Sequence, residues 1–359
     1  SMKQLLSYCL SIILCVSFTG CMENYLDLYP EDKITSASFP ENESDIKLLL
    51  NGVYAQLREK EVYNQGLFGF GITDGATPNA FNWGTDEVFN KLGAGRLSSS
   101  DGGVVTYRWK RCYEIISRAN YLLACMDLVD LSEEAKAKYS GETHFLRGLA
   151  YSVLAETYGG VPIILTNIST EEARSLKRAS LEETWQQALD DYEVAITNLG
   201  VDAPEPGRAT KGAALGMKMR AYLYQGKYKE VLACVEQIDA LKKYGLFHSY
   251  EGLFDPANEN NKEVLFDIQY IEGENSQGSY IDQYCGTGTG SWTRGSRYVP
   301  TDDLVAAYET IDGSPVDPEN PYENRDPRLG FTAVLPGSYF LGYRFPNYLY
   351  PGGAFNPVS

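Results

Sequence analysis

The chain has 359 residues, of which 43% are hydrophobic and 22% are charged, a composition typical of a globular protein. Its formal net charge of −17 argues against a nucleic-acid partner, whose phosphates require stripes of Lys and Arg, and against attraction to an anionic membrane surface. A chain of this length can form one large domain or two smaller ones with a sizeable core.

The N-terminal segment has the pattern of an export signal. Lys3 precedes an apolar run over residues 5–18, which is too short to span a bilayer and fits the core of a signal peptide. The sequence "FTGC" then resembles a bacterial lipobox, so we expect residues 1–20 to be removed and Cys21 to carry lipid. An ordinary signal peptide with an incidental cysteine is the alternative. Residues 21–41 are polar and irregular, as expected for a tether.

Apolar residues that recur at steps of three and four predict a series of amphipathic helices. Ser44 is a plausible N-cap of the first, which places Ile46 and Leu50 on one face. Ser180 and Glu183 form a capping box before another. Short connections predict antiparallel neighbours. The expected helices are 44–59, 106–129, 133–158, 181–199, 210–225 and 227–243.

The last two expected helices resemble a degraded tetratricopeptide repeat. Gly226 falls at the turn between them, and Tyr222 and Tyr228 are expected to wedge between the helices. In the second helix, the residues expected to face inward are Tyr228, Val231, Leu232, Val235 and Ile238.

Two regions lack helical periodicity. Residues 61–105 are rich in Gly, Asn and Asp, and long connections of this kind are often functional. Residues 246–359 contain short apolar pieces separated by Pro, Gly and Asn, with one expected helix capped by Thr301. We therefore predict one domain over 42–359. It is mostly α, with a tetratricopeptide-like array of helix pairs over about 42–245 and a loop-rich, strand-containing, ligand-facing part.

Catalytic and metal-binding patterns were sought without success. The chain has two histidines, His144 and His248, and no zinc-binding motif, P-loop or nucleophile elbow. A glycoside hydrolase needs two carboxylates across a cleft, and the sequence selects no such pair. The segment "DPANENNKE" leaves a structural cation open, although it misses the calcium-loop pattern. No catalytic residue, cofactor or metal site is predicted.

Four cysteines remain after Cys21, and they show neither metal-ligand spacing nor a CxxC motif. We expect buried thiols, although an oxidising compartment would permit a disulfide. The four are Cys112, Cys125, Cys234 and Cys285.

Two aromatic loops have the composition of a sugar-binding surface. Sugars stack their C–H faces on aromatic rings, and their hydroxyls bind amides, carboxylates and Arg. Trp in a loop is not explained by helical periodicity, although each loop could instead fold onto its own scaffold. The candidate ligand-binding residues are Asn79, Phe81, Asn82 and Trp83 in the first loop and Tyr280, Tyr284, Trp292 and Arg294 in the second.

The order and spacing of several segments resemble the SusD/RagB family of outer-membrane glycan-binding lipoproteins. They begin with "CMENYLDLYPEDKITSASF", "LLNGVYAQL" and "RANYLLACM". They continue with "GETHFLRGLAYSVLAETYGGVPIIL", "RATKGAALGMKMRAYLYQGKYKEVLACVEQI" and "YVPTDDLVAAYETIDGSPVDPENPYENRDPRL". The similarity covers nearly the whole expected mature chain.

The resemblance implies a non-enzymatic surface lipoprotein that captures oligosaccharide and delivers it to a SusC-like TonB-dependent transporter. A surface glycoside hydrolase and a peptide-capturing member of the same transporter-lid class are the alternatives. Family members run on into a further helix that closes the array, whereas this sequence ends at "PGGAFNPVS", so we expect a truncated product or an incomplete segment. Glu142 falls on the apolar stripe of its helix and therefore requires a partner, for which Arg118 is the candidate.

Overall fold

The computed structural model describes residues 39–58, 74–82, 91–98, 100–270, 298–340 and 343–344. The predicted signal peptide, Cys21 and most of the expected tether lie outside these residues. Among the described residues, no helix is both long enough and apolar enough to cross a membrane.

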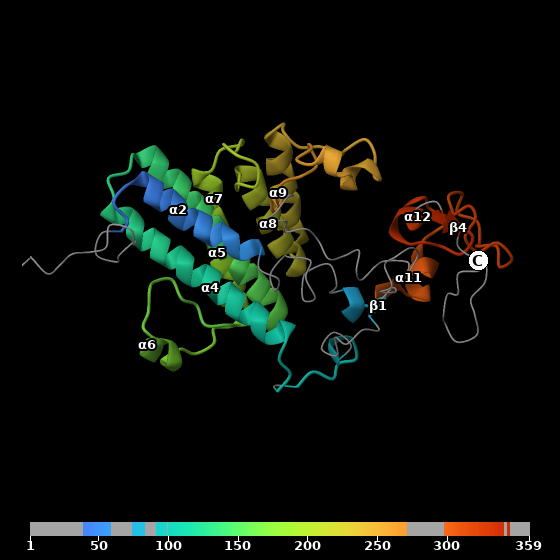
Figure 1. The fold of residues 1–359 in the computed structure, drawn as a ribbon, viewed down its shortest axis with the longest axis horizontal. Helices are drawn as coiled ribbons and strands as arrows, with labels where there is room; N and C mark the ends of the chain where they lie inside the picture. Colours follow the sequence, from blue (N-terminus) through green and yellow to red (C-terminus); the bar gives the residue numbers. More distant parts are fainter. Residues whose placement is uncertain are drawn as a thin grey trace, which may run out of the picture.

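The N-terminal half is a stack of α-helices, which confirms the mostly helical prediction. The longer helices lie side by side, and the short α6 lies in a loop below them (Figure 1). The helices are α2 (Glu43–Tyr54) with the 3-10 turn η1 (Ala55–Arg58), α4 (Val104–Cys125) with η3 (Met126–Leu128), α5 (Glu133–Tyr158), α6 (Thr170–Ser175), α7 (Leu181–Asn198), α8 (Lys211–Tyr224) and α9 (Tyr228–Ala240).

Side-chain caps explain where most of these helices begin. The predicted capping box of Ser180 and Glu183 is confirmed at α7, and Thr210 caps α8 by accepting a hydrogen bond from the Ala213 amide. The prediction for α2 was wrong, because its N-cap is Asn42, whose side chain accepts from the amide of Asp45. Asn42 has the extended backbone that an N-cap requires, whereas Ser44 already lies within the helix.

Helix α5 is the centre of the core, because it packs against α2, α4 and α7 and reaches α8. It approaches α7 closely at Gly148, where an added Cβ would lie 3.0 Å from the ring of Tyr192 and 3.1 Å from the carbonyl oxygen of Ala188. The largest fully buried side chains come from α2, η1, α4, α5 and α7: Ile46, Leu50, Leu57, Ile115, Ile116, Leu122, Phe145, Leu146, Leu149, Tyr151 and Tyr192.

A buried ion pair joins α5 to α7. The Arg147 guanidinium donates to both carboxylate oxygens of Asp191, with distances of 2.7 Å to Oδ1 and 3.0 Å to Oδ2. It also donates to Asn120 Oδ1 on α4 at 2.7 Å, and the Asn120 amide donates to the Ile164 carbonyl at 3.0 Å. The Arg147 and Asp191 side chains are only 7% and 2% exposed, so each depends on the other for its charge compensation.

The predicted inward face of α9 was wrong for Tyr228, Leu232 and Val235, whereas Val231 and Ile238 are half-buried. Cys234 is the only buried residue of this helix, while Tyr228 and Leu232 are 67% and 64% exposed and Val235 is also exposed. Within the described part of the chain, α9 packs mainly on α8, so its second face has no helix over it. Gly226 does form the predicted turn, with a φ of 69°.

The remaining elements are short, as predicted, and all of them except β1 follow α9 in the chain. The helical elements are η4 (Gly252–Phe254), η5 (Pro256–Asn258), α11 (Asp302–Ala307) and α12 (Arg328–Thr332), and the strands are β1 (Ala80–Asn82), β2 (Tyr298–Pro300), β3 (Tyr339–Phe340) and β4 (Tyr343–Arg344). Thr301 caps α11 as predicted. Strand β1 pairs with β2, and β3 pairs with β4, each pair antiparallel.

The predicted buried thiols are confirmed for three of the four cysteines. Cys112, Cys125 and Cys234 are free and buried, and burial raises the pKa of the Cys112 thiol to about 12. Cys285 lies outside the described residues.

We expect Asp191→Ala to destabilise the protein by about 3–5 kcal/mol, because it leaves the Arg147 guanidinium buried without its anion. The measurement is the free energy of unfolding from urea titration. The matched control is Asp202→Ala, which removes an ion pair between Lys243 and an 85% exposed carboxylate and should change stability by less than about 1 kcal/mol. Equal effects of the two substitutions would contradict the assigned role of the buried pair.

Candidate functional site

The two-stranded sheet of β1 and β2 lies beside the candidate ligand-binding residues. Phe81 pairs with Val299 at the middle of the sheet, and Asn82 pairs with Tyr298 at one end. At the other end, the Thr301 amide donates to the Asn79 carbonyl at 3.0 Å. Segments distant in sequence are therefore held together by backbone hydrogen bonds.

This register puts Asn82, the last residue of β1, opposite Tyr298, the first residue of β2. Strand β1 ends at Asn82, so the chain leaves that end toward Trp83, while β2 begins at Tyr298, so the second loop arrives there. In an antiparallel pair, the end of one strand faces the start of the other. The pairing thus joins the bases of the two loops that the sequence had singled out separately.

Few of the candidate side chains can be located. Asn79 is exposed in the turn before β1, and Phe81 is 51% exposed although it lies within a strand. For Asn82 the structure describes the backbone alone. Five of the candidates lie outside the described residues: Trp83, Tyr280, Tyr284, Trp292 and Arg294.

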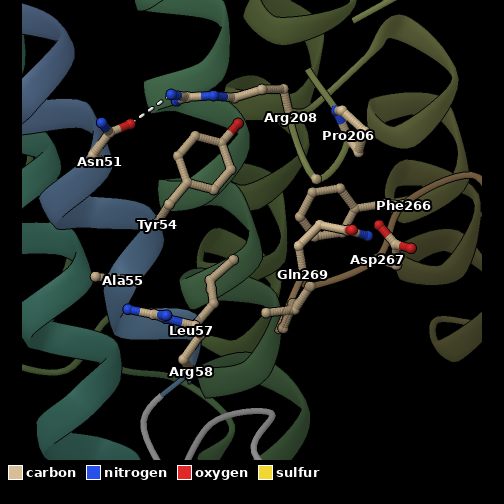
Figure 2. A pocket seen from close by; sticks show the side chains of 12 residues that line it. Asn51, Tyr54, Ala55, Leu57, Arg58, Pro206, Arg208, Phe266, Asp267 and Gln269 are labelled. Atoms are coloured by element: carbon tan, nitrogen blue, oxygen red, sulfur yellow. Dashed lines mark hydrogen bonds between the residues drawn. The ribbon is translucent and has the colours of Figure 1, made fainter. Parts of the chain in front are cut away.

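A hollow of about 210 Å³ lies elsewhere, between α2–η1 and two segments of the later chain. Figure 2 shows Tyr54, Leu57 and Arg58 on one side and Phe266, Asp267 and Gln269 on the other, with Arg208 across one end. The full lining is Asn51, Tyr54, Ala55, Leu57, Arg58, Pro206, Gly207, Arg208, Phe266, Asp267, Ile268 and Gln269.

Arg208 connects this hollow to the buried carboxylate of Glu142. Its guanidinium lies 4.9 Å from the Tyr54 ring centroid, donates to Asn51 and lies 3.4 Å from a Glu142 carboxylate oxygen. The Tyr54 hydroxyl donates to the same carboxylate at 2.7 Å and accepts from the Ala209 amide at 2.9 Å. The charged and hydroxyl groups around Glu142 therefore bond to one another. These contacts connect α2 and α5 to the loop before α8.

The prediction that Glu142 is buried with a partner is confirmed, but the predicted partner was wrong. Glu142 is 2% exposed and pairs with Arg208 and Tyr54, not with Arg118. The sequence motifs that contain Tyr54 and Arg208 gave no spacing signal, because the three residues meet only when the loop before α8 folds back onto α2.

The described residues contain no cluster of metal-ligating side chains. No group of three His, Cys, Asp or Glu side chains among them could hold a metal ion. In "DPANENNKE", the Asp255 carboxylate accepts a hydrogen bond from the Ala257 amide and so serves as a cap of η5.

Comparison with known proteins gives consistent matches along the chain. Residues 24–223 match a family described as "Starch-binding associating with outer membrane", and residues 262–354 match the SusD family. A SusD-like protein of Formosa agariphila is 27% identical over 312 residues, which are 80% of this chain and 57% of that protein. A SusD-like protein of Bacteroides ovatus is 24% identical over 71% of this chain and 48% of its own length.

Solved structures give the same result. A SusD-like carbohydrate-binding protein from Bacteroides fragilis superposes with a TM-score of 0.74 and 29% identity, covering 84% of this chain and 61% of that one. A laminarin-binding SusD-like protein has a TM-score of 0.60 and 22% identity, covering 72% of this chain and 55% of its own. The chain thus spans a little over half the length of most of these proteins.

Burial is the largest influence on the Glu142 carboxyl and raises its pKa above the ordinary 4.5, although Tyr54 and Arg208 act in the opposite direction. A group whose pKa is higher in the folded state than in the unfolded state stabilises the fold fully at pH values below its unfolded-state pKa. This stabilisation is lost as the pH rises through the folded-state pKa. We therefore expect the unfolding free energy of the wild type, relative to Glu142→Gln, to fall as the pH rises from about 4.5. Urea titrations at several pH values measure this difference.

Glu172→Gln is the control with the opposite sign. The backbone amide and hydroxyl of Ser169 lower the pKa of the exposed Glu172 carboxyl, so its contribution is present above the unfolded pKa and is lost as the pH falls. If the stability difference between the wild type and Glu142→Gln instead falls as the pH falls, as expected for Glu172, the folded state prefers the charged form of Glu142.

Proposed function

This chain belongs to the SusD family, and we propose that it is a surface receptor that binds a carbohydrate and passes it to an outer-membrane transporter. The observation that carries the proposal is the pairing of β1 with β2, which brings the bases of both aromatic loops to one end of a sheet. A site with aromatic rings and convergent amides suits the mixed apolar and hydroxyl surface of a sugar.

The related proteins support this ligand class. The Bacteroides fragilis structure is titled a carbohydrate-binding protein, another neighbour is titled laminarin-binding, and the matching family is described as starch-binding. We propose that the present chain binds an oligosaccharide through Asn79, Phe81, Asn82 and Trp83 together with Tyr280, Tyr284, Trp292 and Arg294.

The proposed partner is a SusC-like TonB-dependent transporter, and the proposed location is the outer membrane at the cell surface. Lipid on Cys21 would hold the protein there without a spanning segment, since acyl chains contribute about 0.8 kcal/mol for each buried CH₂. The proposed role is that of a receptor and not of an enzyme.

We expect Trp83→Ala and Trp292→Ala each to weaken oligosaccharide binding about tenfold or more, because a central aromatic contact at an interface contributes about 2 kcal/mol. Phe81→Ala, in the described strand, should weaken it less. Isothermal titration with oligosaccharides of starch and laminarin provides the measurement. Tyr228→Ala, which removes an exposed ring on α9, should leave binding unchanged.

A hydrolase and a peptide receptor predict different results in the same samples. New reducing ends that accumulate during incubation with polysaccharide would identify an enzyme and reject the receptor. Binding of peptides, with no response to any glycan, would identify the peptide-capturing alternative.

We expect Cys21→Ala to release the protein from the membrane fraction of the producing bacterium, because the acylated thiol would be its anchor. Fractionation followed by immunoblotting measures this release, and Cys112→Ala is the cysteine control. Retention of Cys21→Ala in the outer membrane, in cells that lack the transporter, would contradict lipid anchoring.

A further inference from the structure

A group of exposed aromatic rings lies outside the two loops considered so far. We call Tyr250, Phe254 and Phe331 the aromatic cluster. The ring centroids of Tyr250 and Phe254 are 5.4 Å apart at 74°, and those of Tyr250 and Phe331 are 6.2 Å apart at 38°. The three residues are 47%, 70% and 51% exposed, so the rings touch one another while keeping much of their surface in solvent.

Short helical turns hold these rings in place. Phe254 is the last residue of η4. The backbone amide of Gly252, at the start of η4, donates to the Ser249 hydroxyl at 3.0 Å. The side-chain amide of Asn258 donates to the Gly252 carbonyl at 2.8 Å. Phe331 lies on α12, in the C-terminal part of the chain (Figure 1). The cluster therefore joins two segments that are far apart in sequence, and the turn that carries Phe254 is held by side-chain-to-backbone hydrogen bonds.

Polar groups lie beside the rings. The Arg328 Nε donates to both carboxylate oxygens of Asp326, each at 3.0 Å. These hydrogen bonds fix the orientation of the guanidinium plane. Arg328 and Phe331 lie three residues apart on α12, so the guanidinium and this ring occupy neighbouring positions of one helix. The Tyr308 hydroxyl also lies 2.8 Å from the Thr332 hydroxyl.

This combination differs from an unpartnered helix face. The exposed face of α9 contains Leu232 and Val235 with Tyr228 at helical spacing, which is the pattern of a surface that packs against another helix. The aromatic cluster instead presents flat rings beside a paired carboxylate and guanidinium and two hydroxyls. Because Arg328 is paired with Asp326, the polar groups have no net charge to attract an ion, and they suit neutral hydroxyl groups.

We propose that the aromatic cluster is a second carbohydrate-binding site, which takes the apolar face of a neutral sugar on Tyr250, Phe254 and Phe331 and its hydroxyls on Asp326 and Arg328. This inference rests on the proposed function and adds a site to it. The second aromatic loop precedes β2 in the chain, whereas α11 follows β2 and leads to Tyr308. The two sites are thus connected to opposite ends of one strand, so a long glycan can engage both and gain affinity from linkage.

The test is affinity electrophoresis in gels that contain neutral polysaccharides, beginning with soluble starch and laminarin. We expect Phe254→Ala/Phe331→Ala to raise the apparent Kd about tenfold relative to the wild type, and Tyr228→Ala to leave it unchanged. A variant with both loops disabled, Trp83→Ala/Trp292→Ala, should keep partial retardation, which the added cluster substitutions should abolish.

A second variant separates ring stacking from packing. Phe254→Leu/Phe331→Leu keeps apolar volume and should keep the wild-type melting temperature, yet it should weaken retardation as the alanine variant does. Leucine substitutions that bind like the wild type would overturn the proposal.

The remaining outcomes are also decisive. If the polysaccharide gel retards the wild type and the cluster variants equally, the proposed second site is wrong and the proposed function remains intact. A wild type retarded by no polysaccharide would overturn both. Cluster substitutions that change the oligomeric state without changing retardation would show that the rings contact protein instead.

Discussion

The arrangement of the helices in this protein depends on a buried ion pair. Arg147 on α5 and Asp191 on α7 are both buried, and Asn120 on α4 completes the guanidinium's bonding. Such a pair is weakly stabilising when intact, but it makes any other arrangement of these helices leave a charge unpaired. The pair therefore sets how α4, α5 and α7 lie against one another, and the apolar residues around it supply most of the stability.

The helices could be predicted from the sequence because their signals are local. The bounds of α5 follow from an apolar stripe and a capping serine, and α7 follows from the Ser180 box. Two predictions failed where the answer depended on tertiary contacts. The partner of Glu142 is distant in sequence, so no local pattern identifies it. The buried face of α9 depends on which elements pack against the helix, and periodicity alone does not show this.

The candidate site shows the same division. Composition singled out both aromatic loops, yet nothing in either loop indicated that β1 and β2 would pair, because three-residue strands carry almost no periodic signal. The aromatic cluster could not be predicted from the sequence for a similar reason. Its rings come from a turn after α9 and from α12, and each ring alone resembles an ordinary surface aromatic. In the aromatic cluster the Arg328 guanidinium is paired with Asp326, which agrees with the neutral sugar proposed as its ligand.

The pairing of β1 with β2 also has a consequence for how the protein is made. Strand β1 follows α2 and precedes α4 in the chain, whereas β2 follows α9, so the helices from α4 to α9 are synthesised between the two strands. Closing so long a loop is entropically unfavourable unless the intervening residues are already compact. Loop entropy therefore favours docking of the two strands after the helices between them have become compact.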